Sequence, residues 1–148
     1  MNMNLEWQPL YSVGNEQLDA HHKRILGLTN KLYNAVKDGE EEHAILEILQ
    51  SLTKYAEVHF KEEELLFSQT SYPNAYGHRC RHQEFRITLQ QLKDSFQQKE
   101  RFVGLELMEF LMSWLNGHIL QIDMQYVPFI KNISSASTSP TATSTPAE

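Results

Sequence analysis

The sequence has little of the residues and patterns that mark several large classes of protein. It contains a single cysteine, Cys80, so no disulfide framework can form within the chain. No Lys/Arg-rich run occurs and the net charge is −6, which argues against a nucleic-acid partner. No apolar run reaches the length of about 18 residues that a transmembrane helix needs, and the first residues lack the pattern of a secretory signal. We therefore expect a cytoplasmic protein that neither binds nucleic acid nor inserts into a membrane.

Patterns typical of β-strands are also missing, since no segment of useful length alternates apolar and polar side chains. Apolar residues instead recur at helical spacing over approximately 19–38, 41–68, 73–98 and 102–131. Asp19 is the expected N-cap of the first helix, Gly39 ends it, and Pro73 suits the first turn of the third helix. Because the connections are short, we predict an all-α fold: an antiparallel up-down-up-down four-helix bundle with an extended N-terminal arm.

The composition divides the chain into two parts. Residues 1–133 form the predicted bundle, whereas residues 134–147 are only Ser, Thr, Ala and Pro before the final Glu148. A segment of this composition cannot bury enough apolar surface to fold. We therefore predict a disordered tail over residues 134–148.

What the chain does contain is an unusual number of histidines, seven, several of them inside apolar helical stripes. His59 and Glu63 stand one helical turn apart on the second helix, and His78 and His82 have the same spacing on the third. Residues one turn apart share a face, so each pair can reach a single metal ion. A buried charge without a partner is costly, so such pairs inside a core stripe indicate ligands rather than packing residues.

The first and fourth helices place polar residues at the same end of the predicted bundle. His22 continues the apolar stripe of the first helix while His21 points to its flank, and His118 lies on the buried side of the fourth. An α-helix rises about 1.5 Å per residue. The first ligand histidine of each helix therefore lies roughly 24 to 30 Å along the axis from the helix end that is farther from the site. Neighbouring helices run in opposite directions, so these residues meet at one level. Asp123 is five residues after His118, about 140° out of phase, so we predict a local π-type distortion there.

Five histidines and two carboxylates are thus expected to converge: His22, His59, Glu63, His78, His82, His118 and Asp123. They are too many for one tetrahedral zinc ion, which takes four ligands. If both carboxylates and one oxo or hydroxo group bridge two octahedral ions, eleven of twelve positions are filled and one stays open, which suits non-haem iron. His43, beside an acidic helix start, is interpreted as a surface residue. His21 is retained as an alternative ligand.

These residues stand in motifs that resemble those of the haemerythrin family, specifically its single-domain bacterial members. The resemblance covers about residues 7–130. It consists of W-x4-S-V-G from Trp7, L-D-x-x-H ending at His22, HFKEE from His59, H-x3-H-x2-F from His78 and H-x4-D from His118. The resemblance implies two iron ions, bridged by carboxylates and by an oxo or hydroxo group, that bind O2 reversibly.

The resemblance also assigns a role to each ligand. It implies one iron held by His78, His82 and His118, a second held by His22 and His59, and bridges from Glu63 and Asp123. O2 would bind the two-histidine iron, which has the open position. The residues that match the O2 pocket of the family are Ile25, Phe60, Trp114, Leu115 and Ile119. Glu62 and Glu64 are interpreted as solvated neighbours of the ligands.

We expect O2 storage, delivery or buffering, and not an enzyme. Our hypothesis is that two carboxylates stabilise high oxidation states less than the four Glu of ferritin-like sites, so that O2 can leave. Two other functions stay open: an O2- or redox-sensing module, and a di-iron enzyme or iron-handling protein. A sensor would normally carry a recognisable signalling domain, and here there is only the tail. The sequence does not identify a further partner, either an O2-consuming enzyme or a signalling protein.

Overall fold

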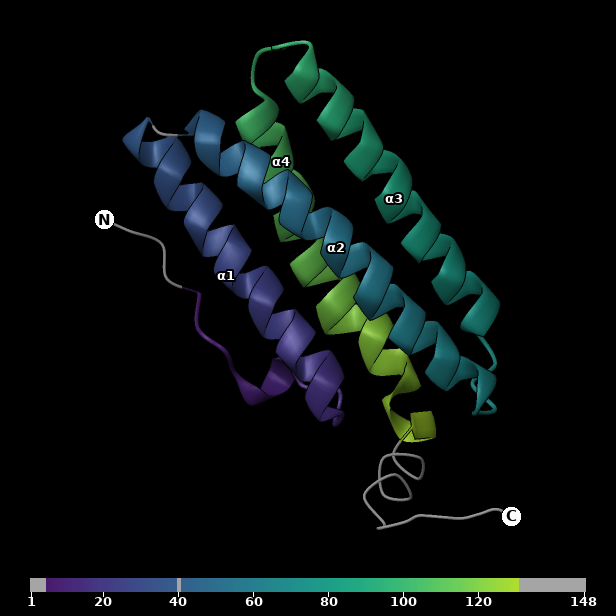
Figure 1. Cartoon of the computed structure of the whole chain (residues 1–148). Coiled ribbons are helices and arrows are strands. Elements are labelled where there is room, and N and C mark those ends of the chain that lie inside the picture. The colour runs from purple at the N-terminus through teal and green to yellow at the C-terminus, as the bar shows by residue number, and fades with distance from the viewer. Residues whose placement is uncertain (1–4, 40, 131–148) are drawn as a thin grey trace.

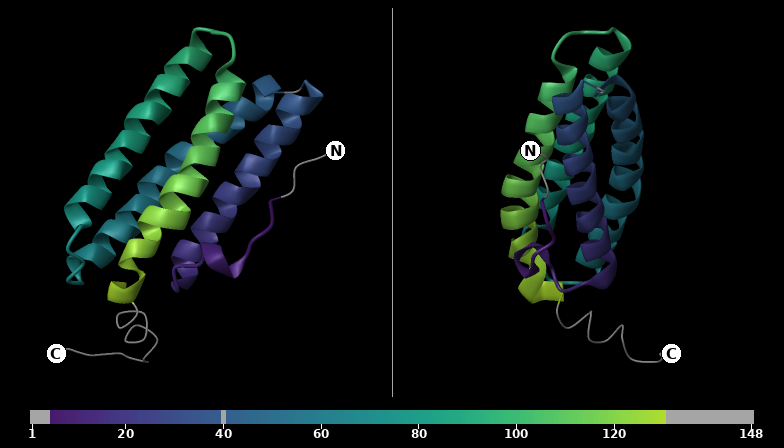
Figure 2. Two further views of the ribbon diagram at one scale, coloured as in Figure 1. Left: turned by 180° about the vertical axis from the view of Figure 1, so that it is seen from behind. Right: turned by 90° about the vertical axis from the view of Figure 1, so that its left-hand side faces the viewer.

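The computed structural model describes residues 5–39 and 41–130, and within them it is an all-helical bundle without strands. Helices α1 (Glu16–Asp38) and α3 (Ala75–Gln97) run in one direction, and α2 (Glu41–Ser68) and α4 (Val103–Ser113) run in the other (Figure 1, Figure 2). The predicted antiparallel four-helix bundle is confirmed. The predicted tail over 134–148 lies outside the described residues. Among the described helices, none combines the length and apolar character that crossing a bilayer requires.

Two of the predicted helix starts are wrong by a few residues. Helix α1 begins at Glu16, because Asn15 is the N-cap and its side chain accepts a hydrogen bond from a backbone N–H of the first turn. The predicted cap Asp19 instead accepts hydrogen bonds from the Ser12 hydroxyl and the Val13 N–H, which ties the incoming chain to α1. Helix α3 begins only at Ala75, so Pro73 lies in the preceding turn rather than in the helix.

The fourth helix changes its winding where two of the predicted ligands stand. Helix α4 passes into the π-helical segment η2 (Trp114–Ile122) and then into the 3-10 turn η3 (Asp123–Tyr126). The backbone N–H of Asp123 bonds to the carbonyl of His118, five residues earlier. Residues five apart therefore share a face, as a π-helix allows and an α-helix does not. The predicted distortion is confirmed, and it extends over nine residues.

An extended arm lies along α1 before the bundle begins, as predicted (Figure 1). The backbone of Leu5 makes two hydrogen bonds with the side chain of Asn30, at 2.7 and 2.9 Å. Trp7 stacks on Tyr11, and the ammonium of Lys23 lies over the Trp7 ring. These contacts hold the arm beside the first helix, with Tyr11 close to the start of α1. The 3-10 turn η1 (Pro9–Tyr11) ends there.

The buried apolar side chains form two separate clusters. The larger has twenty residues from all four helices and η2. The smaller has six: Val13, Leu18, Phe67, Tyr72, Tyr126 and Ile130. Along α1 the order is Leu18, His22 and Ile25. The other helices also have their polar residues between the two clusters, with Tyr72 of the smaller cluster just before α3. A buried polar layer therefore separates the two apolar clusters.

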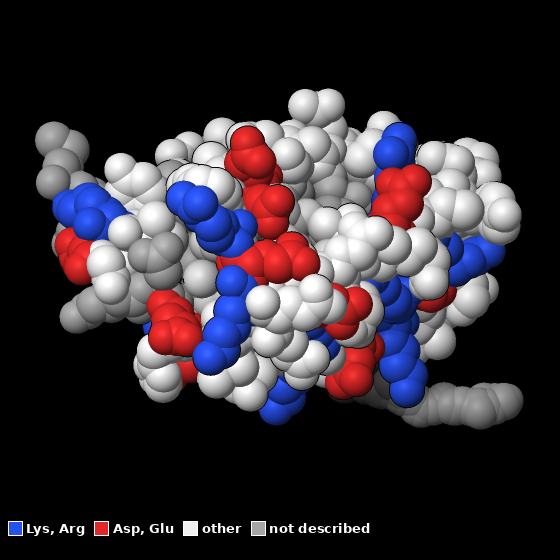
Figure 3. Space-filling view, turned by 90° about the horizontal axis from the view of Figure 1, so that it is seen from above, with Lys and Arg blue, Asp and Glu red and all other residues white. Residues whose placement is uncertain are grey.

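Charged side chains of both signs lie on the end of the bundle that is farther from this polar layer. Lys and Arg are interspersed with Asp and Glu over the face shown in Figure 3. A nucleic-acid surface would need a patch or stripe of basic residues. On this face the Lys and Arg side chains form no such patch, because Asp and Glu lie between them.

Candidate metal centre

The structure brings all seven predicted ligands together in the polar layer, and each is buried, the most exposed being His118 at 5%. They come from all parts of the bundle: α1 supplies one, α2 and α3 supply two each, and η2 and η3 supply one each. The seven are His22, His59, Glu63, His78, His82, His118 and Asp123.

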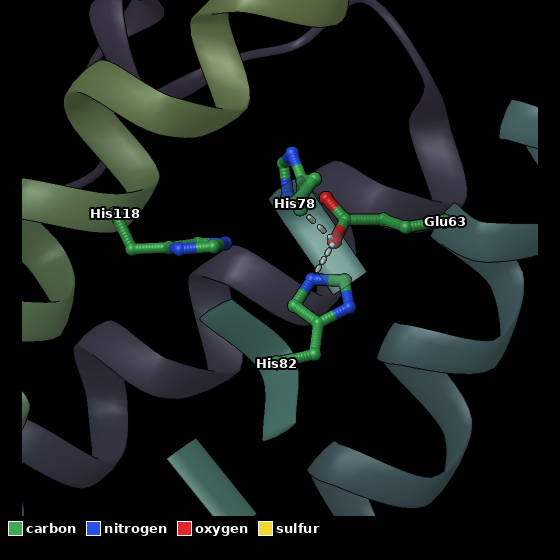
Figure 4. A group of neighbouring side chains, drawn as sticks. All are labelled: Glu63, His78, His82 and His118. Atoms are coloured by element: carbon green, nitrogen blue, oxygen red, sulfur yellow. Dashed lines mark ion pairs between the residues drawn. The ribbon is translucent and has the colours of Figure 1, made fainter. Parts of the chain in front are cut away.

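Glu63 faces histidines on both sides of the cluster. Its Oε1 is 2.9 Å from Nε2 of His82 and 3.6 Å from Nε2 of His78, whereas its Oε2 is 3.4 Å from Nε2 of His59. Figure 4 shows Glu63 converging with His78, His82 and His118 from α2, α3 and η2. One carboxylate oxygen therefore faces the α3 histidines and the other faces His59.

Asp123 divides its oxygens in the same way. Its Oδ1 is 2.9 Å from Nε2 of both His78 and His118, and its Oδ2 is 3.2 Å from Nε2 of His22. Each carboxylate thus presents one oxygen to a group of three histidines and the other to a group of two. This is the arrangement that a carboxylate needs in order to bridge two cations.

The inner atoms of the cluster lack hydrogen-bond partners. Nε2 of all five histidines, Oε1 of Glu63 and both carboxylate oxygens of Asp123 are buried without a hydrogen bond among the described residues. Buried polar atoms in native proteins nearly always have a partner. Within the described chain two sets of donor atoms lie close enough to hold an ion each, and Glu63 belongs to both. Two metal ions would satisfy these atoms, so the residues fit a dinuclear centre.

Without metal, the cluster is stabilised as a set of ion pairs. Burial opposes the charge of His78, but its ion pairs with the Asp123 and Glu63 carboxylates outweigh burial and raise the pKa of His78 to about 9. Burial also raises the pKa of the Glu63 carboxyl, but the neighbouring His59, His78 and His82 hold that pKa well below its ordinary value. The pKa of Asp123 is lowered as well, because its histidine neighbours outweigh burial and the charge of Glu63. Both carboxylates are therefore anionic at neutral pH, as cation binding requires.

Comparison with known proteins agrees with this geometry. The family model described as "Hemerythrin HHE cation binding domain" matches residues 13–130, most of the chain. The chain belongs to the haemerythrin family. A "Bacteriohemerythrin" of Pseudomonas aeruginosa is 33% identical over 129 residues, which cover 87% of this chain and 83% of that protein.

Two further relatives support the same assignment. The chain is 25% identical to a "Bacteriohemerythrin" of Clostridium acetobutylicum over 126 residues, 82% of this chain and 97% of the relative. It is 28% identical to a "Hemerythrin-like protein" of Naegleria gruberi over 120 residues, 81% of this chain and 88% of the relative. The chain therefore carries a cation-binding domain of the family along nearly its whole described length.

In three candidate ligands the outer ring nitrogen, Nδ1, contacts a hydrogen-bonding group, and the group is different in each case. Nδ1 of His82 is 2.8 Å from Oε2 of Glu64, and Nδ1 of His22 is 3.3 Å from the carbonyl oxygen of Tyr11. Nδ1 of His59 is 2.9 Å from Nδ1 of His21. An acceptor at Nδ1 keeps the proton there, so that Nε2 is free to bind metal. Glu64 is a neighbour of a candidate ligand, as predicted, but it is only 28% exposed and contacts His82 directly.

Aromatic rings cover the candidate ligands. Phe60 stacks on His82 with ring centroids 3.9 Å apart, and Trp114 stacks on His118 at 3.7 Å. Tyr55 stacks on His59 at 4.8 Å, and its hydroxyl accepts a hydrogen bond from the Trp114 indole N–H. These rings hold the imidazole planes and exclude water from them.

Two tyrosines beside the centre were missed by the sequence analysis as site residues. Tyr126 is fully buried, and its hydroxyl donates a hydrogen bond to Oε2 of Glu63. Tyr55 stands one turn before His59 on α2. Helical spacing could have indicated both. Tyr55 stands four residues before His59 and Tyr126 three residues after Asp123, so each lies about one turn from a candidate ligand.

The five predicted O2-pocket residues are all buried in the larger apolar cluster: Ile25, Phe60, Trp114, Leu115 and Ile119. Phe60 and Trp114 lie against the three-histidine group, on His82 and His118. A surface cavity of about 380 Å³ between α3 and the fourth helix has Trp114 in its lining. The lining of an O2 pocket by all five residues stays a prediction.

The remaining histidines lie outside both sets of donor atoms. The side chain of His43 is 82% exposed and pairs with Glu47, in agreement with its interpretation as a surface residue. His21 belongs to neither set of donor atoms, although it touches the candidate ligand His59. Its role as an alternative ligand therefore receives no support.

Proposed function

We propose that this haemerythrin binds O2 reversibly at a non-haem di-iron centre, as a storage, delivery or buffering protein rather than an enzyme. In this proposal His78, His82 and His118 hold one iron, His22 and His59 hold the other, and Glu63 and Asp123 bridge the two. When bound, the irons would supply the reversible electron donation that holds O2.

The proposal is supported above all by the positions of the carboxylate oxygens of Glu63 and Asp123 relative to the two histidine groups. Each carboxylate offers one oxygen to the three-histidine group and one to the two-histidine group. Five imidazoles, two bridging carboxylates and one bridging oxygen would fill eleven of the twelve positions of two octahedral ions. The two-histidine group offers one ligand fewer, so the open position would lie there.

The surroundings of the centre favour binding over oxidation. Two carboxylates donate less negative charge than the four Glu of ferritin-like sites, so high oxidation states are less stabilised. Leu115 and Ile119 are at most 2% exposed, and with Ile25 they would keep water from the open position. Exclusion of water slows proton delivery and therefore the loss of O2 as a reduced product.

The test is repeated oxygenation of the iron-loaded protein. Metal analysis should find two irons per chain. After anaerobic reduction, the visible absorption that appears with air should vanish under argon and return with air over several cycles. His59→Ala should abolish the cycling because the two-histidine group loses a ligand, while His43→Ala, which alters an exposed histidine, should leave it intact. Irreversible oxidation on the first exposure, with peroxide released or consumed, would contradict the proposal and favour an enzyme.

A further inference from the structure

One contact of the metal centre pairs two histidines with each other. His21 of α1 and His59 of α2 have their Nδ1 atoms 2.9 Å apart, and the rings meet edge to face at 77° with centroids 5.0 Å apart. His59 is buried, whereas His21 is half-buried. Two ring nitrogens at this distance can share only one proton, so one ring donates and the other accepts.

The other nitrogen of His59 decides which ring donates. Nε2 of His59 faces Oε2 of Glu63 at 3.4 Å and is one of the inner atoms without a hydrogen-bond partner. An imidazole that binds metal through Nε2 carries its proton on Nδ1. His59 is therefore the donor, and Nδ1 of His21 is the acceptor.

We propose that His21 is a positioning residue of the metal centre, which orients His59 by accepting the hydrogen bond from its Nδ1–H. This inference rests on the proposed function, because it takes His59 to be a metal ligand. Ligand histidines usually donate to a carboxylate, a backbone carbonyl or water. Here His82 and His22 follow that rule with Glu64 and Tyr11, whereas His59 uses a second imidazole.

The position of His21 makes the idea testable without disturbing the core. His21 stands at the edge of a surface cavity of about 300 Å³, lined also by Arg24, Lys54 and Val58. Neither apolar cluster contains His21. A substitution there therefore removes the contact with His59 while the apolar packing of α1 against α2 stays intact.

Two substitutions separate the hydrogen bond from the volume of the ring. His21→Asn puts an oxygen at the position of Nδ1, since both atoms are two bonds from Cβ, so an acceptor for His59 is kept. His21→Phe keeps a planar ring but places a C–H against the Nδ1–H of His59. His43→Phe is the matched control, because it makes the same change at an exposed histidine outside the site.

The experiment measures the affinity of the metal-free, full-length proteins for Co²⁺. Each protein is titrated in competition with a chelator, and the two binding steps are fitted separately. Loss of an outer hydrogen bond to a ligand histidine weakens metal binding by about 10- to 100-fold. We expect a loss of this size in one of the two steps for His21→Phe, values close to wild type for His21→Asn, and no change for His43→Phe.

The outcomes distinguish this inference from the function on which it rests. Two Co²⁺ bound by wild type, with His21→Phe unchanged, would overturn the role of His21 alone. The same holds if His21→Asn is as weak as His21→Phe, because the acceptor would then not be the cause. A wild-type protein that takes up fewer than two ions would overturn both proposals. Circular dichroism of the metal-free variants checks that each has folded.

Discussion

The orientation of each imidazole in this centre depends on both of its nitrogens. The inner nitrogen, Nε2, faces a carboxylate oxygen. For three of the histidines the outer nitrogen, Nδ1, meets an acceptor, and the type of acceptor differs from one histidine to the next. His82 has the anionic Glu64, whereas His22 has a backbone carbonyl and His59 has an imidazole. An anionic acceptor makes a ligand more electron-rich than a neutral one does. In the proposed centre, His82 of the three-histidine group would therefore be a stronger donor to metal than His22 or His59.

At the residue scale, His78 predicts how the stability of the metal-free protein depends on pH. Its pKa is raised from 6.5 to about 9 by Asp123 and Glu63, against the effect of burial. Protonated His78 therefore stabilises the fold fully below pH 6.5, and this contribution is lost as the pH rises through about 9. The shift corresponds to about 3 kcal/mol. The pKa of His22 is also raised, through Asp123 against burial, so it acts in the same direction.

Urea unfolding of the metal-free protein between pH 6.5 and 9.5 measures this effect. The free energy of unfolding should fall across the range in wild type, and it should fall clearly less in His78→Gln, where only the His22 contribution is left. Two bound metal ions should remove most of the dependence, because Nε2 of His78 then binds metal instead of a proton. Stability that stays level or rises with pH in metal-free wild type would contradict the assignment of charge to His78.

The convergence of the seven candidate ligands could be predicted from the sequence because six obey the spacing of an α-helix, and Asp123 follows once a π-type distortion is assumed. Their spacing places them on buried faces, and the opposite directions of neighbouring helices bring them to one level. Glu64 and His21 obey no such rule, since they stand on the flanks of their helices. Whether a flank residue reaches a ligand on a neighbouring helix depends on how the two helices are rotated about their axes. The rotation of one helix about its axis relative to its neighbour cannot be predicted from a single sequence.

At the scale of the element, η2 is what allows one helix to supply both His118 and Asp123. The spacing of the two residues, once they are taken as ligands of one centre, requires the backbone to wind more loosely between them. The sequence therefore predicted the distortion between His118 and Asp123 but not its length. The π-helical segment begins at Trp114, four residues before His118, where no ligand spacing indicates it. The helix starts show the same limit: the sequence analysis chose Asp19 as the N-cap of α1, whereas the structure uses Asn15, a residue type that caps equally well.

Gly117 tests whether η2 needs a glycine. Its φ is not in the left-handed region, and a Cβ added there would meet nothing within 4 Å. Glycine inside a helix costs about 0.5 to 1 kcal/mol relative to alanine. Gly117→Ala should therefore raise the free energy of unfolding by about this amount and leave the binding of two metal ions unchanged.

Gly27→Ala is the matched control for this prediction. Gly27 lies in the regular α1, and a Cβ there also meets open space. Chemical unfolding should give similar gains for the two variants. A gain at Gly27 together with a loss of stability or of metal binding at Gly117 would mean that the π-helical backbone depends on the glycine.

For the whole molecule, the metal centre is also a structural layer. It separates an apolar cluster of twenty residues from one of six. The smaller cluster has fewer buried apolar residues, so we expect it to stabilise the ends of the helices less than the larger cluster stabilises the rest of the bundle. Bound metal ions would join the two clusters, because the candidate ligands come from all four helices. When metal is absent, the clusters are linked through carboxylate–histidine ion pairs, and the end with the smaller cluster should open locally more often.

Hydrogen exchange along α2 measures this difference within one helix. Phe67 belongs to the smaller cluster and Leu52 to the larger, on opposite sides of His59 and Glu63. In the metal-free protein the amide of Phe67 should exchange at least about tenfold faster than that of Leu52, which corresponds to about 1.4 kcal/mol. Two bound Co²⁺ ions should narrow this ratio, because the ligands on all four helices then hold the end of the bundle closed. If the ratio of exchange rates does not change when metal binds, the amide of Phe67 exchanges by fraying at the end of α2. Metal would then not be what holds the smaller cluster to the larger one.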